Sequence, residues 1–286
     1  MLVVLVNALG AAGALATGPD EPRPEVESGV SAGRLRPLWE LGIGLTGLSL
    51  PDYRGSDQTH NYLLPLPYAV YRGRILKADR DGARALLFDA PRVKVDVSLA
   101  GTTPTRSSNN EARTGMPDLL GVGEIGPNLS LTLLASPADH WKLDLRLPLR
   151  AAVTLQRAPQ FIGTTFSPNL NFDLDGGGVG WNAGLLTGPL FADRKYHDHY
   201  YSVDSIYATP ARPAYQARGG YAGWQALASA SRRIGDFWFG AFLRYDTLRG
   251  AVFEDSPLVR RSTALTFGFG LAWVLSASTE LVPSTD

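Results

Sequence analysis

The sequence WKLDLRLPLRAAVTLQ, from Trp141 to Gln156, decides the fold class of this chain. Apolar residues alternate there with polar or charged residues along most of the stretch. A β-strand turns successive side chains to opposite faces, so one face of this stretch is apolar and the other is charged. An ordinary strand has about 5–6 residues, whereas a strand that crosses a bilayer needs about 9–11. The stretch is therefore long enough to be a membrane-crossing strand.

The same period of two continues on both sides of this stretch. It is clear in Trp39–Leu45, Val93–Leu99 and Leu265–Leu275. The pattern predicts about twelve strands, at 39–45, 61–71, 73–80, 83–89, 93–99, 119–134, 141–156, 166–175, 179–188, 221–233, 236–248 and 265–275. The segments 73–80 and 83–89 are short and weakly patterned, so about ten strands is the alternative.

The connections between these strands alternate in length. Short turns are predicted at 136–140, 175–178 and 234–236, and long loops at 102–118, 189–220 and 249–261. Bacterial outer-membrane barrels have short periplasmic turns and long outer loops. Closure of such a sheet also removes the free edges that lipid cannot satisfy. We therefore predict an all-β fold, a closed antiparallel transmembrane β-barrel over residues 38–275, in preference to a soluble β-sandwich, whose strands also alternate.

Composition narrows the class of protein further. The chain has 286 residues, with 27 Lys and Arg against 27 Asp and Glu, 44% hydrophobic residues and no cysteine. The balanced charge argues against a nucleic-acid partner. The lack of any apolar run of about 20 residues argues against a helical membrane protein. The lack of cysteine excludes a disulfide framework, a thiolate metal site and a cysteine nucleophile.

The two ends of the chain are predicted to lie outside the barrel. Residues 1–16 are apolar and uncharged and end in Ala14-Leu15-Ala16, which predicts a signal peptide for export. Residues 17–37 are polar and proline-rich and predict a periplasmic tether, while residues 276–286 predict a polar C-terminal tail. A signal peptide followed by a barrel predicts a place in the bacterial outer membrane.

Most of the tryptophans fall near one rim of the predicted barrel. Four of them begin strands that run away from the periplasm, and a fifth lies near the end of the last returning strand. Indole rings prefer the membrane–water interface. We therefore predict a membrane-interface girdle that consists of Trp39, Trp141, Trp181, Trp238 and Trp273.

Charged residues on the other face of the strands are predicted to line the lumen of the barrel, and they carry both signs. They are Glu40, Lys94, Asp96, Glu124, Lys142, Asp144, Arg146, Arg150, Asp173, Arg244 and Asp246. Charges inside a narrow barrel must pair or stay hydrated. A barrel of about twelve strands lies between those filled by side chains and those filled by water. We therefore expect a paired, partly filled interior with at most a narrow pore.

An ordered set of short sequence blocks resembles a known family. The blocks are Pro51–Asp57 (PDYRGSD), Leu63–Tyr68 (LLPLPY), Tyr71–Gly73 (YRG), Lys77–Gly82 (KADRDG), Gly115–Asp118 (GMPD) and Glu124–Asn128 (EIGPN). Together they resemble the MipA/OmpV family of Gram-negative outer-membrane proteins, and the similarity covers essentially all of 38–275.

The resemblance implies a β-barrel with no enzymatic activity and no cofactor of its own. In the name-giving member it implies a scaffold that links a lytic murein transglycosylase to a peptidoglycan synthase. Other members are associated with adhesion, osmotic response and antibiotic susceptibility, so a narrow diffusion channel or a surface adhesin is the alternative. The implied partners are outer-membrane lipid and these two murein enzymes. No catalytic, cofactor-binding or metal-binding residue carries over.

The first of these blocks is the sharpest functional candidate. It consists of Pro51, Asp52, Tyr53, Arg54, Gly55, Ser56 and Asp57. Proline and glycine set a turn and aspartate caps it, which is the structural interpretation that we favour. Gating or surface recognition is the functional alternative. A third possibility is a loop that folds inward so that Arg54 pairs with acidic residues of the barrel wall.

Three other patterns imitate known sites and fail on their context. Residues 121–126 match G-x-G-x-x-G, but an alternating strand follows where a phosphate-binding helix should begin. Residues 171–176 imitate the start of a calcium loop, but Asn182 stands where a bidentate glutamate is needed. His197 and His199 lie in a tyrosine-rich loop that we expect at the surface, and two histidines alone do not make a metal site. No histidine lies in a recognisable nucleophile motif, so we predict no enzyme.

Overall fold

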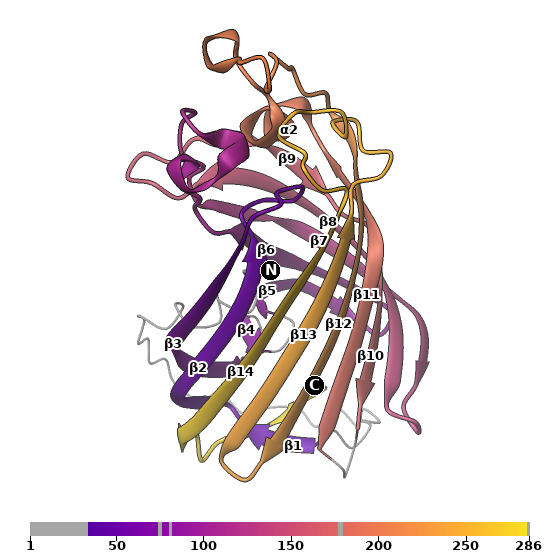
Figure 1. Cartoon of the computed structure of the whole chain (residues 1–286). Coiled ribbons are helices and arrows are strands. Elements are labelled where there is room, and N and C mark those ends of the chain that lie inside the picture. Colours follow the sequence, from indigo (N-terminus) through magenta and orange to yellow (C-terminus); the bar gives the residue numbers. More distant parts are fainter. Residues whose placement is uncertain (1–33, 74–75, 80–81, 177–179, 285–286) are drawn as a thin grey trace.

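The computed structural model describes residues 34–73, 76–79, 82–176 and 180–284. The predicted signal peptide and residues 17–33 of the predicted tether lie outside the described residues. The described chain is mostly antiparallel β-sheet, curved into a barrel-like shape with loops and short helices at one end (Figure 1). We call the space inside the curved sheet the lumen.

The main sheet consists of long strands that follow one another along the chain. They are β2 (Trp39–Pro51), β3 (Thr59–Arg72), β4 (Leu76–Asp79), β5 (Gly82–Ala90), β6 (Val93–Thr102), β7 (Val122–Ser136), β8 (Trp141–Thr154), β9 (Phe161–Phe166), β10 (Asn169–Asp175), β11 (Trp181–Ala192), β12 (Gly220–Ile234), β13 (Phe237–Thr247) and β14 (Thr263–Ala277). Neighbours in sequence are neighbours in the sheet, and β14 pairs with β2.

Strands β9 and β10 share one position in the sheet. Both pair with β8, through Arg150↔Thr165 and Leu145↔Leu170, and both also pair with β11. The sheet therefore has twelve strand positions, in agreement with the prediction of about twelve, and the alternative of ten is wrong. The N-terminal half of this broken strand, Phe161–Phe166, was not expected, because 156–165 shows no regular alternation.

The alternation that predicts the strands also determines which face each residue occupies. In β8, Asp144 is 4% exposed and turns to the lumen, whereas Leu149 is 51% exposed and turns outward. In β13 the same parity leaves Phe239 and Leu243 exposed on the outside. The outer face of the sheet is therefore apolar and accessible along its strands.

A second, two-stranded sheet lies at the end of the molecule opposite the helices (Figure 1). It pairs β1 (Arg34–Pro37) with β15 (Leu281–Ser284), with Leu35 opposite Pro283 and Pro37 opposite Leu281. Residues 34–37 of the predicted tether and 281–284 of the predicted tail are therefore ordered as strands. The sequence did not predict this pairing, because four residues are too few to show a period.

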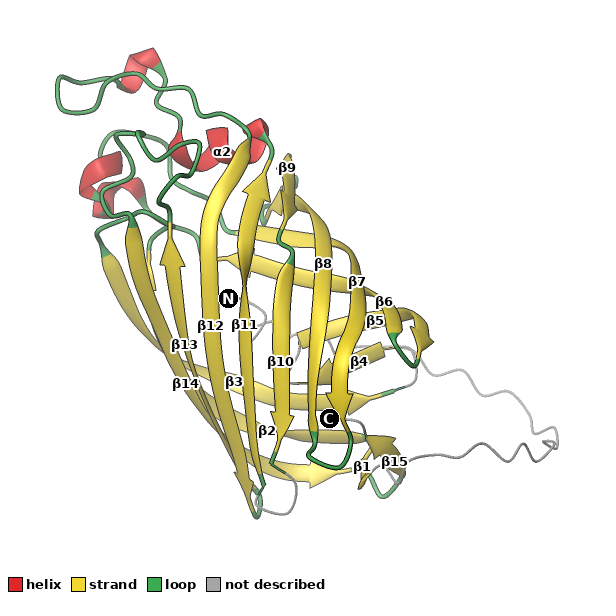
Figure 2. Cartoon of the chain, turned by 90° about the vertical axis from the view of Figure 1, so that its right-hand side faces the viewer, coloured by secondary structure: helices red, strands yellow, loops and turns green. Residues whose placement is uncertain are grey.

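The most tightly packed apolar core lies in the long loops rather than in the sheet. Residues 52–58, 103–121, 193–219 and 248–262 form one layer over an end of the sheet, which we call the cap (Figure 2). The cap contains helix α2 (Arg194–Tyr201) and the short 3-10 helices η1 (Ser107–Asn109), η2 (Glu111–Arg113) and η4 (Ser205–Tyr207). The expected loops are therefore folded together.

Candidate functional site

Arg54 joins the cap to the wall of the sheet. Its loop lies between β2 and β3 and folds inward, so that Arg54 Nε lies 3.0 Å from Asp246 Oδ1 on β13. Arg54 Nη1 also donates to the carbonyl oxygen of Ala222 on β12, at 2.9 Å. Asp246 accepts two further hydrogen bonds from Arg244, at 2.7 and 2.8 Å. This is the inward-folded arrangement that the sequence left open for Arg54.

The remaining residues of the block PDYRGSD hold the loop against the rest of the cap. Asp52 Oδ2 accepts from Asn110 Nδ2 at 2.7 Å, and Ser56 Oγ accepts from the same nitrogen at 3.1 Å. Tyr53 donates through its hydroxyl to the carbonyl oxygen of Leu258 at 2.8 Å. Gly55 has φ +100°, and a Cβ there would lie 2.9 Å from a methyl group of Leu248.

Pro51 and Asp57 delimit the same block. Pro51 is the last residue of β2, and its pairing partner Thr59 is the first residue of β3. Asp57 is exposed at the tip of the loop. The block is thus a turn, in which Asp52 and Ser56 bind a neighbouring loop and Arg54 reaches the lumen.

The tyrosine-rich segment forms the core of the cap, which corrects the expectation that it lies at the surface. The Tyr201 ring stacks on Phe253 with centroids 3.7 Å apart, and His197 meets the same ring edge-on at 4.5 Å. His197 is completely buried and Tyr201 is 4% exposed. The sequence concealed this because helix α2 spaces these side chains three and four residues apart, on one face of a helix.

Burial changes the acid–base properties of these groups. Desolvation lowers the pKa of His197, although a hydrogen bond from Nδ1 to the carbonyl oxygen of Arg218, at 2.6 Å, opposes the shift. Desolvation also raises the pKa of Tyr200 to about 12 and raises that of Tyr201 further. His197 is therefore neutral at physiological pH, and both tyrosines keep their protons.

A second contact connects α2 to the lumen. Tyr196 donates through its hydroxyl to Glu124 Oε1 on β7 at 2.9 Å, and Thr165 on β9 donates to Glu124 Oε2 at 3.1 Å. Asp193 caps the helix by accepting from the backbone N–H of Tyr196 at 2.8 Å. The side chains of Tyr53, Arg54 and Tyr196 line the lumen, so the cap forms its end wall.

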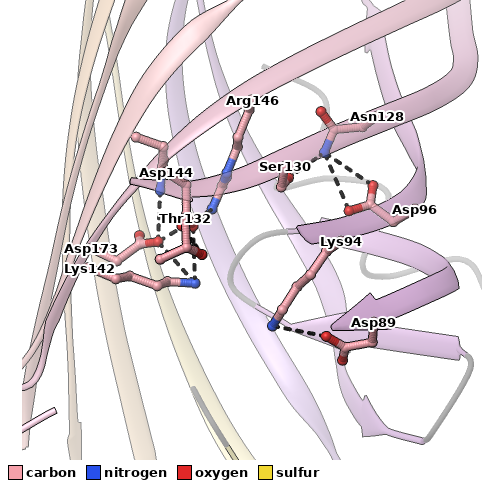
Figure 3. A network of polar contacts seen from close by, with 11 residues as sticks. Asp89, Lys94, Asp96, Asn128, Ser130, Thr132, Lys142, Asp144, Arg146 and Asp173 are labelled. Carbon is pink, nitrogen blue, oxygen red and sulfur yellow. Dashed lines mark hydrogen bonds and ion pairs between the residues drawn. The ribbon is translucent and has the colours of Figure 1, made fainter. Parts of the chain in front are cut away.

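Charged side chains of both signs form a network on one wall of the lumen (Figure 3). Lys142 Nζ lies 3.5 Å from both Asp144 and Asp173, and Arg146 lies 3.3 Å from Asp173. Asn171, from the sequence that imitates a calcium loop, donates to Asp173 Oδ2 at 2.7 Å. Asp173 of that motif is therefore engaged with cations of the protein.

The other predicted lumen charges are placed as follows. Asp96 accepts from Asn128 at 3.3 Å (Figure 3), and Arg150 Nε donates to Ser98 at 2.9 Å. Glu40, near the opposite end of the lumen, is 1% exposed. Its two carboxylate oxygens lie 3.3 Å from Arg72 and 2.6 Å from Arg233. Each charged residue predicted to line the lumen thus occupies an inward-facing position of its strand.

Four of the five tryptophans predicted for the girdle occupy outward-facing positions of their strands. Trp181 and Trp273 are about half exposed, at 47% and 48%. Trp238 is different, because it occupies an inward-facing position of β13 and lines the lumen. Its ring packs on Tyr68, with ring centroids 6.1 Å apart. Its membership of a lipid-facing girdle is wrong. Phe237, beside it, takes the outward position and stacks on Trp273.

Among the residues that the structure describes, no group of three or more histidine, cysteine, aspartate or glutamate side chains could hold a metal ion. Within the same part of the chain, no helix has the length and apolar character needed to cross a membrane. Residues 121–126 enter strand β7 rather than a helix, so the G-x-G-x-x-G pattern has no phosphate-binding helix behind it.

Comparison with known proteins identifies the family. Among solved structures, one similar chain is a bacterial polysaccharide outer membrane secretin, with 10% identity and a TM-score of 0.44 over 83% of this chain and 99% of that chain. No curated protein matches the chain. The family model described as MltA-interacting protein MipA matches residues 43–275, most of the chain, and the chain therefore belongs to the MipA family.

Proposed function

We propose that this chain is a closed β-barrel of the bacterial outer membrane, without catalysis of its own, and that it holds murein-remodelling enzymes at that membrane. The observation that carries the proposal is the match to a family described as MltA-interacting. The partners that follow are a lytic murein transglycosylase and a peptidoglycan synthase. Outer-membrane lipid surrounds the barrel.

Placement in a membrane is supported by the outer face of the sheet. Large apolar side chains are exposed there on strand after strand, including Ile43, Leu63, Leu149, Leu185, Leu243 and Phe269. Contiguous apolar surface of this extent is rare on a soluble monomer and marks a membrane or protein contact. Strands β2, β3, β7, β8, β12 and β14 each have 13–15 residues, and about 9–11 tilted residues cross a bilayer.

The position of the cap favours a scaffold, rather than an open channel, as the function of the chain. It closes one end of the lumen with side chains that are hydrogen-bonded to the wall, among them Arg54 and Tyr196. The charges below it are paired with one another. A wide diffusion channel needs a hydrated, unobstructed path. Planar-bilayer recordings of the purified chain should therefore show no large steady conductance, and such a conductance would favour the channel.

The two-stranded sheet of β1 and β15 is the surface that we assign to the enzymes. It lies at the end of the molecule opposite the cap (Figure 1), and Leu35 and Leu281 are 62% and 53% exposed on it. Exposed apolar side chains that lie together on a small sheet are suited to a protein contact.

Co-purification tests the proposal as a whole. The chain should be extracted from bacterial membranes under mild solubilisation, and the captured proteins should be identified by mass spectrometry. A lytic transglycosylase is expected in the eluate, and its absence together with that of any peptidoglycan synthase would contradict the scaffold. A variant with Leu35→Asp and Leu281→Asp should lose the enzymes and keep the barrel.

A further inference from the structure

The lumen has two chemically different halves. On β13, β14, β2 and β3 its lining is mainly apolar and includes Leu66, Tyr68, Val70, Trp238 and Phe242. On β6, β7, β8 and β10 its lining is mainly charged or amide-bearing and includes Lys94, Asp96, Asn128, Lys142, Asp144, Arg146, Arg150, Asn171 and Asp173. The enclosed space is ≈640 Å³, within the range of about 300–1,000 Å³ that small-molecule sites occupy.

Glycines keep the apolar half open. A Cβ at Gly240 would overlap the ring of Trp238, and a Cβ at Gly268 would lie 2.5 Å from the ring of Phe242. Both rings therefore lie directly over a glycine of the wall. The apolar half thus has aromatic side chains that line the lumen, and the cost of exposing such surface to water favours an apolar occupant.

The two halves meet at a place where the sheet is not fully paired. Strand β3 pairs with β2 along its whole length, but on its other side it pairs with β4 only at Tyr71 and Arg72. Strand β6 pairs with β5 only from Val93 to Val97. Within the described ranges, no strand pairing joins residues 59–70 of β3 to residues 98–102 of β6. We call this unpaired stretch the lateral window.

The composition of β3 fits a strand with one free edge. Pro65 and Pro67 lack the N–H that a paired strand would use, and proline is confined to edges and bulges of sheets. From Leu63 to Val70 the strand is also apolar on both faces. Strand β8, in contrast, carries charged residues on its lumen face, at Lys142, Asp144, Arg146 and Arg150. Strand β3, which borders the window, is therefore suited to apolar surroundings both outside the sheet and in the lumen.

Paired segments frame the window above and below. Above it, the carbonyl oxygen of Asp52 accepts from Thr105 Oγ1 at 2.9 Å, and Asp52 Oδ2 accepts from Asn110, so two cap loops are tied together. Below it, Tyr71 and Arg72 pair with β4. The lateral window therefore lies along the strands and not at the end of the barrel that the cap covers.

We propose that the lumen binds an amphiphile from the membrane, which enters through the lateral window. Its hydrocarbon chain lies against the apolar half, near Leu66 and Trp238, and its polar headgroup faces the charged half, near Asp96 and Arg150. Both signs of charge and several amides face the headgroup, so it is a polar or zwitterionic group that accepts and donates hydrogen bonds. This site goes beyond the scaffold and rests on the membrane placement proposed above.

Spin labels can test the membrane placement and the lumen site separately. Each label can be attached to a single introduced cysteine, because the chain has no cysteine of its own. Single cysteines at Leu63, on the outside, and at Leu66, in the lumen, would each carry a nitroxide in the full chain in phospholipid vesicles. Collisions with oxygen report hydrocarbon, and collisions with a water-soluble nickel chelate report water. A label at Asp139, in an exposed turn, provides the aqueous reference.

The label at Leu63 tests the membrane placement, and the label at Leu66 tests the site. We expect both to collide with oxygen and to be protected from the nickel chelate. If Leu63 behaves so while Leu66 collides with the chelate, the lumen is filled with water and the site is wrong. If Leu66 is protected from both reagents, the space is packed with protein and the site is equally wrong.

Native mass spectrometry of the chain released from membranes gives the second readout. We expect a bound mass that identifies the amphiphile, and tandem spectra would tell a phospholipid from a lipid A species or a fatty acid. Leu66→Asp should remove the bound mass, because it places a carboxylate in the apolar half. Asn182→Asp adds the same charge to the polar lining and should retain it. A spectrum of the wild-type chain without a bound amphiphile would overturn the proposal.

Discussion

Arg54 and Asp246 are 192 residues apart in sequence, and Arg54 Nε lies 3.0 Å from Asp246 Oδ1. The arginine comes from the loop after the first long strand, and the aspartate comes from β13 near the other end of the chain. Their contact connects the cap to the wall of the lumen. Asp246 is almost buried and has Arg244 as a second partner, whereas Arg54 has the carbonyl oxygen of Ala222.

The two partners of this ion pair should not be equally sensitive to substitution. Arg54→Gln removes the ion pair with Asp246 and weakens the contact with the carbonyl oxygen of Ala222, but it leaves Asp246 with Arg244. We therefore expect a loss of about 1.5–3 kcal/mol, the range for a hydrogen bond to a charged group. Asp246→Ala leaves two arginines without their carboxylate and should cost about 3–5 kcal/mol. The unfolding transition of purified chain, followed by circular dichroism in urea, measures both.

A surface ion pair provides the control for this comparison. Arg194 lies 3.4 Å from Asp198 on the exposed side of α2, and Arg194→Gln should change stability by less than about 1 kcal/mol. Equal losses for Arg54→Gln and Asp246→Ala would show that Asp246 is not the centre of the contact.

Phe253 should hold the cap together. It is fully buried between Tyr201 and His197, and removal of a buried phenylalanine side chain costs about 3–5 kcal/mol. Phe253→Ala is therefore expected to loosen residues 193–219 and to leave the strands intact. Hydrogen exchange of the cap peptides measures this, with Ile206→Ala, at a 79% exposed position, as the unaffected control. Faster exchange in β12 and β13 would contradict a local effect.

The cap should weaken in acid through His197. Its pKa in the folded chain is lowered, mainly by burial, below the ordinary value of 6.5. Above that value both folded and unfolded states are neutral and the full stability is present. As the pH falls from about 6.5 toward the lower folded pKa, the unfolded state takes up the proton first and stability is lost.

Exchange of the cap amides between pH 7.5 and pH 5 tests this direction. We expect protection to fall as the pH falls, and His197→Gln, which keeps a donor near the carbonyl oxygen of Arg218, to flatten the dependence. His199 has a pKa that burial also lowers, and it contributes a residual slope of the same sign. Protection that rises toward pH 5 in the wild-type chain would contradict the assignment.

Glu40 should be the most costly charge to remove near the β1–β15 end. Both of its oxygens are engaged by arginines, and it is 1% exposed. Glu40→Gln leaves Arg72 and Arg233 with less compensation and should cost about 3 kcal/mol, the lower end for a broken buried pair, because Arg233 is partly exposed. Thermal unfolding of the purified chain measures this, and Glu280→Gln, at an exposed turn, should have no effect. A variant as stable as wild type would show that water compensates both arginines.

The strands could be predicted from the sequence because each long strand has one apolar and one polar face. In β8 the alternation from Trp141 to Thr154 determines both the element and its orientation. Trp238 shows the limit of the same argument. Its place along the strand suggested a girdle, but β13 carries aromatic residues on both faces. Only the alternation with Phe239 and Leu243, which turn outward, shows that Trp238 faces the lumen.

Features that depend on contacts between distant segments could not be predicted. Helix α2 has eight residues and is stabilised by the packing of Tyr201 on Phe253, more than fifty residues along the chain. The β1–β15 pair joins the two ends of the described chain. Arg54 could be proposed to reach an acidic residue, but several acidic residues face the lumen, and only the curvature of the sheet selects Asp246.

Direct binding of a lytic murein transglycosylase is the most direct test of the scaffold. The full chain would be immobilised in lipid nanodiscs and titrated with purified enzyme, with empty nanodiscs as reference. We predict saturable binding that Leu35→Asp combined with Leu281→Asp abolishes and that Ile206→Ala, in the cap at the opposite end, leaves unchanged. Enzyme retention equal to that on empty nanodiscs at every concentration would contradict the scaffold.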